Sequence, residues 1–342
     1  MSPEAQSILK EWSPPILINV VIVLTALCYL RGWLSLRRTS PELFAPWRLS
    51  AFLASMFSLW IAIGSPLSAF DEASLTVHMI QHILLMLVVP PLVLLGAPSL
   101  PLLHGLPQGF VRTTLGPFLR WPRVQSLGKS LTHPLVCWIL ASVALLAWHV
   151  PSAFELALRS DAWHELEHFC FLSTSILFWW PVVQPFPSES RWPRWTIPLY
   201  LFFGTFPGGA LGAFLVFCDR VLYPSYIEAP SLFGITPLVD QIFAGSLMWV
   251  FGLFVLLLPG VFITLHLLSP LDPEPPLCHA TRNRSATMCN PRLTWDGNTT
   301  HVWGSRSGGR ERCGSVDNLE TSLTWEAIDC IRGETLPSAM SS

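Results

Sequence analysis

The stretch that decides the fold is VHMIQHILLMLVVPPLVLL, residues 77–95, which contains no Lys, Arg, Asp or Glu. An apolar run of this length can cross the roughly 30 Å hydrocarbon core of a membrane as one helix. His78 and His82 lie near its start and are separated by one helical turn. Polar residues at membrane depth are costly unless they are paired, hydrated or metal-bound, so this span predicts a membrane helix that carries a functional site.

The rest of the chain has the same character. Of its 342 residues, 51% are hydrophobic and only 12% are charged, which is not the composition of a soluble globular protein. We predict an all-α, polytopic transmembrane helical bundle of about seven spans. By hydropathy the spans are Ile16–Leu34, Leu49–Ser65, Val77–Leu95, Leu135–Val150, His164–Val183, Trp195–Phe217 and Gln241–Leu268.

Basic residues give the expected orientation, because Lys and Arg are retained on the cytoplasmic side of a membrane. The first, third and fifth connecting loops contain Arg31, Arg37, Arg38, Arg48, Arg112, Arg120, Arg123, Lys129, Arg191 and Arg194. The segments on the other side contain only Lys10, Arg159 and Arg220. We therefore expect the N-terminus outside and the C-terminus inside. The first span lacks a small-residue cleavage site, which indicates a retained anchor and not a signal peptide.

The composition changes at about Asp272. Residues 1–271 form the predicted seven-span domain, whereas residues 272–342 are polar and rich in Gly, Ser and Arg. This tail has too few apolar residues to form a core, so we predict a disordered cytoplasmic segment. A small domain holding metal through Cys278, Cys289, Cys313 and Cys330 is the alternative, although their spacing is irregular.

With this orientation, five histidines reach the external side of the bundle. They are His78, His82, His149, His164 and His168. Residues four apart lie about 40° apart around a helix, so each of the two pairs can point into the bundle. An interfacial, hydrated histidine is the ordinary explanation for any one of them. Two pairs on the same side favour a shared metal or haem site.

The donor types favour copper. Neutral imidazole is the most common metal ligand, and its second nitrogen is often held by a carboxylate, here Asp71 or Glu167. Met86 continues the stripe of His78 and His82 as an auxiliary thioether ligand or as a packing residue. Histidine with methionine suits copper, and zinc accepts the same imidazoles. Asp240 is expected to cap a helix or, as the alternative, to face the site.

Three functions are compatible with these residues. The first is a non-enzymatic maturation factor that passes copper to a client protein. The second is a redox protein that holds haem b between paired histidines and exchanges electrons with quinone. The third is a copper transporter, which the confinement of the ionisable residues to one face disfavours. No phosphate-binding loop, nucleophile elbow or H-E-x-x-H motif is present, so we expect no hydrolase or group transferase.

Several short motifs together resemble the CtaG family of cytochrome c oxidase assembly proteins over roughly Leu49–Leu268. They are HMIQHILLM at 78–86, PPL at 90–92, LGAP at 95–98, WHVP at 148–151, LEH at 166–168, FWWPV at 178–182, and DQ at 240–241 with MW at 248–249. The resemblance implies a multi-pass protein of the bacterial plasma (inner) membrane that is needed to form a haem-copper oxidase. It also implies copper handling, with an oxidase subunit and a copper chaperone as partners. The composition itself predicts membrane lipid as a partner, and the formal net charge of -2 gives no indication of nucleic acid.

Overall fold

Every regular element is a helix in the part of the chain that the structure describes, residues 3–185, 192–230 and 234–269 of a computed structural model. The predicted tail, residues 272–342, and Arg191 lie outside the described residues. The helices are α1 Pro3–Glu11, α2 Ile16–Thr39, α3 Pro46–Ile63, η1 Pro66–Phe70, α4 Leu75–Ile83, η2 Leu84–Val88, α5 Val89–Leu95, α6 Ser99–Gly105, α7 Gln108–Phe110, η3 Val111–Leu115, α8 Gly116–Arg120, α9 Pro122–Leu131, α10 Pro134–Trp148, α11 Pro151–Leu158, α12 Asp161–Val183, α13 Thr196–Phe217, α14 Ser225–Glu228 and α15 Pro237–Leu268.

The predicted all-α membrane bundle is confirmed. Six helical stretches are long and apolar enough to cross a membrane, and a seventh crossing requires α9 and α10 together. These two helices meet at a bend of 72°. Alone, α10 has 15 residues and is about 22 Å long at 1.5 Å per residue, which is shorter than a membrane core. Prolines set where α10 starts and where the next helix starts, because Pro134 begins α10 and Pro151 begins α11.

The span that contains His78 and His82 changes its helical geometry midway. It runs as α4, then as the π-helical turn η2, then as α5. Pro90 has no N–H to donate to the carbonyl of Met86 four residues earlier. The indole N–H of Trp179 on α12 donates to that carbonyl instead, at 3.1 Å. The motif residues Pro90 and Trp179 thus form one structural unit that joins the third and fifth spans.

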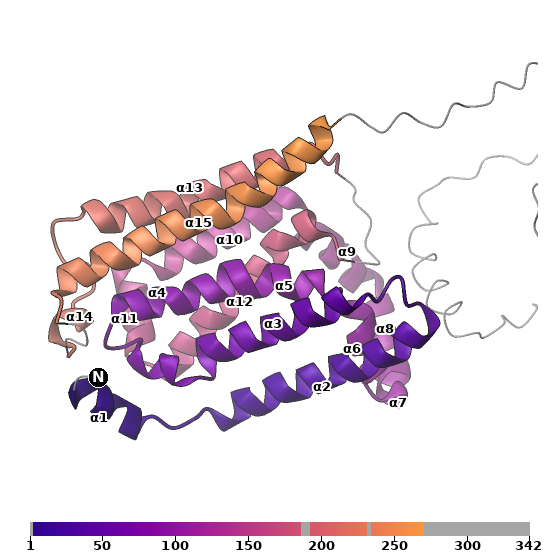
Figure 1. Ribbon diagram of the computed structural model, residues 1–342, viewed down its shortest axis with the longest axis horizontal. Helices are drawn as coiled ribbons and strands as arrows, with labels where there is room; N and C mark the ends of the chain where they lie inside the picture. Colours follow the sequence, from indigo (N-terminus) through magenta and orange to yellow (C-terminus); the bar gives the residue numbers. More distant parts are fainter. Residues whose placement is uncertain (1–2, 186–191, 231–233, 270–342) are drawn as a thin grey trace, which may run out of the picture. The chain divides into compact units, whose positions relative to one another are not determined.

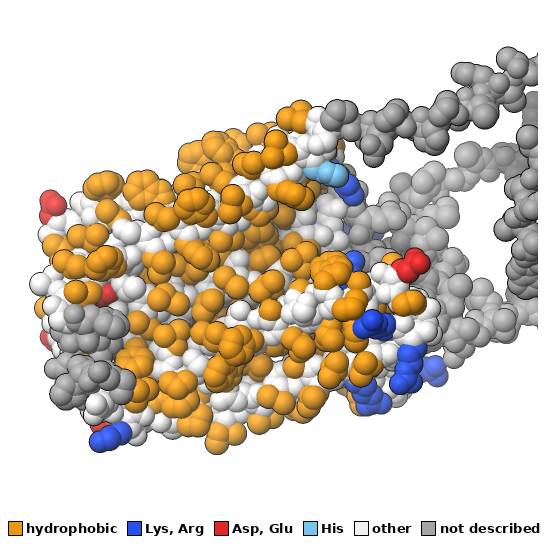
Figure 2. Space-filling view, viewed as in Figure 1, with side chains coloured by type: hydrophobic (Ala, Val, Ile, Leu, Met, Phe, Trp, Pro, Cys, Tyr) orange, Lys and Arg blue, Asp and Glu red, His pale blue; other side chains and the backbone are white. Residues whose placement is uncertain are grey.

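The spans lie roughly along one another, with α13 and α15 packed together on one side and α2 on the opposite side (Figure 1). The start of α4 lies at the same end of the bundle as α11 and α14, and α6–α9 lie at the other end. Hydrophobic side chains cover the flank between the ends, and Lys and Arg gather mainly near α6–α8 (Figure 2). The bundle is therefore embedded in a membrane, and the outside location of its N-terminus stays a prediction.

Two glycines allow α13 and α15 to approach closely. A Cβ added to Gly212 would lie 2.7 Å from the carbonyl oxygen of Gly245, and one added to Gly245 would lie 2.8 Å from the carbonyl oxygen of Gly212. Both distances are shorter than a Cβ atom and a carbonyl oxygen can tolerate. The close approach of the two helices therefore requires glycine at position 212. At Gly208, by contrast, the nearest atom to an added Cβ is a Leu145 methyl at 3.9 Å.

We expect Gly212→Ala to lower the free energy of unfolding by about 1–3 kcal/mol, because the backbones of α13 and α15 must separate. Gly208→Ala is the matched control, since its methyl enters open space on the same helix and gains up to about 1 kcal/mol of helix propensity. Thermal unfolding in detergent measures both variants. Equal midpoints would contradict the packing described here.

Candidate metal centre

The first two histidines project from α4 into the interior. His78 and His82 are both fully buried, and their rings meet edge to face with centroids 4.3 Å apart. Their i, i+4 spacing places them on one face of the helix, as the sequence predicted. Gln81 is also fully buried on α4, whereas the buried Met79 and Ile83 are apolar. The pair therefore lies in a mainly hydrophobic interior.

Helix α12 brings a second set of donors to the same place. His164, Glu167 and His168 share one face of its first two turns, and the rings of His164 and His168 are 4.3 Å apart. The carboxylate of Glu167 is completely buried and lies between the α4 histidines. Its oxygens are 3.9 Å from Nε2 of His78 and 3.7 Å from Nε2 of His82.

A third helix, α10, contributes His149. This residue ends the helix, where its Nδ1 donates to the carbonyl of Leu145 at 2.8 Å. A carbonyl can only accept, so this bond fixes the tautomer and leaves Nε2 as a free acceptor. The ring of His149 is buried. A neutral ring with one nitrogen held by a carbonyl is the usual state of a metal-binding imidazole.

The structure brings all five predicted histidines together. The ring of His82 lies 5.7 Å from those of His149 and His168, and the ring of His78 lies 5.2 Å from that of His164, measured between centroids. Three helices, which the sequence separates by up to 90 residues, contribute to this cluster. We call these five histidines with Glu167 the histidine cluster.

The histidine cluster is short of hydrogen bonds. Neither nitrogen of His78 or His82, and neither oxygen of Glu167, has a hydrogen-bond partner, and the same is true of Nε2 of the other three histidines. Buried polar atoms are nearly always bonded, so this concentration of unpaired polar atoms requires an explanation. One ligand atom from each of His78, His82 and Glu167 lies within 4.8 Å of the others. Such separations are too long for hydrogen bonds and suit donors that surround one cation.

Asp71 lies at the edge of the histidine cluster. Its carboxylate is 4.0 Å from Nε2 of His164. It lies just past the 3₁₀ helix η1, and burial raises the pKa of its carboxyl to about 7. The hydroxyl of Tyr226 donates to the carbonyl of Asp71 at 2.8 Å and holds the turn in place.

Asp240 does not point at the histidine cluster. The sequence suggested that it caps a helix or faces the site, and it caps a helix other than its own. From the first turn of α15, its carboxylate accepts from the backbone N–H of Leu75 at 2.7 Å and of Thr76 at 3.3 Å. It also accepts from the hydroxyls of Ser74 and Thr76. It thus satisfies the free N–H groups that begin α4, the helix of His78 and His82.

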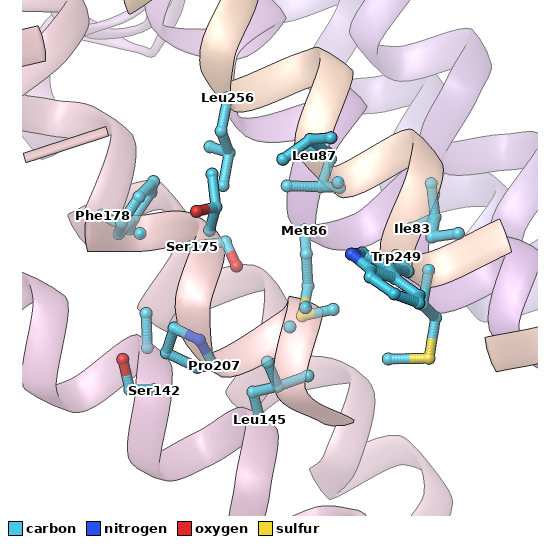
Figure 3. Close-up of a pocket in the computed structure, with 18 residues that line it drawn as sticks. Ile83, Met86, Leu87, Ser142, Leu145, Ser175, Phe178, Pro207, Trp249 and Leu256 are labelled. Carbon is cyan, nitrogen blue, oxygen red and sulfur yellow. The ribbon is translucent and has the colours of Figure 1, made fainter. Parts of the chain in front are cut away.

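Met86, the predicted auxiliary ligand, points into an apolar cavity of about 90 Å³ between α10, α12, α13 and α15 (Figure 3). None of the five histidines lines this cavity. The expectation that Met86 continues the stripe of His78 and His82 assumed α-helical spacing. The π-helical turn η2 begins at Leu84, and its wider turn changes the face that Met86 occupies. We therefore leave Met86 out of the donor set considered below.

Sequence reasoning missed the aromatic residues that shape the site. The hydroxyl of Tyr223 donates to the carbonyl of His149 at 3.1 Å, and its ring stacks on Phe154 at 4.0 Å between centroids. Phe154 and Phe171 are fully buried and pack against the rings of His78 and His82. The one signal in the sequence was the scarcity of tyrosine, since the chain has only four. In the structure each of the four tyrosine hydroxyls donates to a main-chain carbonyl of another segment.

The fold and the site define a class, a polytopic helical membrane protein with a buried histidine–carboxylate cluster at one end of its bundle. Within that class the chain belongs to the family described as cytochrome c oxidase caa3 assembly factor (Caa3_CtaG), whose model matches residues 27–269. That range includes every member of the histidine cluster. The family resemblance seen in the sequence motifs is confirmed.

The similar curated proteins are mycobacterial. An uncharacterized protein of Mycobacterium tuberculosis and one of Mycobacterium bovis are each 26% identical to this chain over 251 residues, and one of Mycobacterium leprae is 25% identical over 248 residues. The matches cover 70–72% of this chain and 36–38% of the relatives. The chain thus spans well under half the length of the curated relatives it matches. No solved structure matches it.

Proposed function

We propose that this assembly factor works without catalysing a reaction, in a bacterial plasma membrane. It binds copper in the histidine cluster on the external side and passes the ion to an oxidase subunit, after receiving it from a copper chaperone. The observation that carries the proposal is the unpaired state of the histidine cluster. Nε2 of His78 and Nε2 of His82 on α4 lie within 4.0 Å of the buried carboxylate of Glu167 on α12, and none of these atoms has a hydrogen-bond partner.

The donor chemistry supports copper as cargo. Imidazole suits copper, zinc and iron, whereas magnesium and calcium prefer a shell of oxygens that this site lacks. No cysteine belongs to the group of donors formed by His78, His82 and Glu167 among the described residues. Without a closed thiolate cage, individual ligands can exchange one at a time. Such a site can release its ion to a client that offers better ligands.

Ring spacing argues against the haem alternative. The macrocycle of a haem held by two histidines must lie between their rings. On the facing helices α4 and α12, the rings of His78 and His164 lie only 5.2 Å apart and those of His82 and His168 only 5.7 Å apart between centroids. Phe154 and Phe171 fill the adjacent space. A small cation fits this arrangement and a macrocycle does not.

Copper content tests the proposal. We expect the purified full-length protein to retain copper at a fixed stoichiometry, and the variant His78→Ala/His82→Ala to lose nearly all of it, because two of the closest donors are gone. Elemental analysis after removal of free metal measures the content. An absorption spectrum with an intense haem band would instead favour the redox protein.

The matched control is His104→Ala/His266→Ala, which removes two imidazoles from other parts of the bundle. His104 bonds only to a carbonyl of its own helix, and His266 lies in the last turn of α15. This control should hold as much copper as the parent. Equal copper content in the parent and in His78→Ala/His82→Ala would overturn the proposal.

A further inference from the structure

The histidine cluster approaches the protein surface through the two α12 histidines, His164 and His168, which are partly exposed, and Asp71 borders His164. Of the carboxylate–histidine pairs within 4.0 Å, the two that involve Glu167 have no exposed side-chain surface. The third joins Asp71 to His164, whose side chains are 7% and 21% exposed. His164 lies in the first turn of α12, at the end of the bundle.

Aromatic side chains pack around the inner members of the histidine cluster. Phe154 packs against His78 and His149, and Phe171 packs against His82 and His149. Both phenylalanines are fully buried, and Tyr223 stacks behind Phe154. A hydrated cation cannot pass this apolar wall. An ion reaching His78 and His82 therefore needs a path lined by donors.

Asp71 and His164 begin such a path. The ring of His164 stacks on that of His78 with centroids 5.2 Å apart and planes 24° apart, and His78 is next to Glu167. The order Asp71, His164, His78, Glu167 thus forms a series of neighbouring donors from partly exposed to fully buried. Each step is short enough for an ion to gain one ligand before it loses the previous one.

We propose that Asp71 and His164 form an outer metal position through which copper enters and leaves the inner position of His78, His82 and Glu167. The inner position determines how tightly the ion is held, and the outer one determines how fast it is exchanged. This inference rests on the proposed function, because it takes copper as the cargo of the histidine cluster. No bond other than metal–ligand bonds changes, and the ion keeps its oxidation state.

The test separates exchange rate from copper content. The full-length protein in detergent is loaded anaerobically with Cu(I), and a water-soluble Cu(I) chelator then removes the ion while absorbance is followed. In Asp71→Asn, a change at the edge of the histidine cluster, we expect release and loading to slow at least tenfold, with final copper content equal to that of the parent. In His164→Gln we expect the same slowing of both steps. Size-exclusion chromatography establishes that each variant is folded.

Glu165→Gln is the matched control, since it removes an exposed negative charge next to His164 in the sequence. It should exchange copper at the parental rate. Unchanged rates in both Asp71→Asn and His164→Gln would overturn the outer position. A loss of copper as large as that of His78→Ala/His82→Ala would also overturn it, because all the donors would then form one centre. A parent without copper would instead overturn the proposed function itself.

Discussion

Glu167→Gln is expected to make the metal-free protein more stable and its copper binding weaker. Glu167 is completely buried, and neither of its oxygens has a hydrogen-bond partner. A carboxylate in this environment is costly without a cation, and buried charges can often be replaced by neutral groups with a gain in stability. We expect the midpoint of thermal unfolding to rise by about 2–4 °C, which corresponds to about 1 kcal/mol in a protein of this size.

The same substitution removes the carboxylate that lies within 4.0 Å of both His78 and His82, and no other carboxylate of the described residues does so. A carboxylate either binds the ion or supports the imidazoles that do, and losing such a partner costs about 10–100-fold in metal affinity. Copper should therefore stabilise the parent against unfolding much more than it stabilises Glu167→Gln. Competition with a chelator of known affinity measures the loss directly.

The control for this pair of effects is Glu155→Gln. Glu155 accepts from the backbone N–H of Ser225 at 3.1 Å and from the hydroxyl of the same residue, which ties α11 to α14. Its substitution should lower stability and leave copper affinity unchanged, the reverse of the expectation for Glu167. If Glu167→Gln lowers the unfolding midpoint and retains parental affinity, the carboxylate is structural and the assignment is wrong.

Asp240→Ala should cause a large loss of stability together with a loss of copper. The substitution removes four interactions at the start of α4 and leaves the N–H groups of Leu75 and Thr76 without a partner in a buried place. We expect the free energy of unfolding to fall by about 2–3 kcal/mol. The start of α4 should then fray, and His78 lies in its first turns.

Asp240→Asn provides the graded comparison, because its amide oxygen can still accept while its NH₂ group faces donors. Its loss of stability should be about half as large. Asp219→Ala, an exposed acid in the loop that precedes α14, should change neither property. Thermal unfolding and copper content of the three variants test whether the Asp240 cap is needed both for stability and for copper binding. Parental copper content in Asp240→Ala would show that the cap does not position His78 and His82.

The sequence alone determined the class of fold and the residues of the site. Long apolar runs must be helices in a membrane, because only intrahelical bonds satisfy their backbone groups there. The i, i+4 spacing then places His78 with His82, and His164 with His168, on single faces, and both pairs point inward. Polar residues in such helices are conspicuous against an apolar background, so the five histidines and Glu167 could be found without a structure.

The tertiary structure decided what these residues contact. Local spacing placed Met86 on the stripe of His78 and His82, as an auxiliary ligand or as a packing residue. In the structure, after the π-helical turn that begins at Leu84, Met86 lines an apolar cavity. Asp240 lies 165 residues from Leu75, and no local rule indicates that it caps the helix of His78 and His82. Hydropathy and helical periodicity depend on neighbours in the sequence. The distances between α4, α10 and α12, and the missing hydrogen bonds of the histidine cluster, arise only when the helices pack.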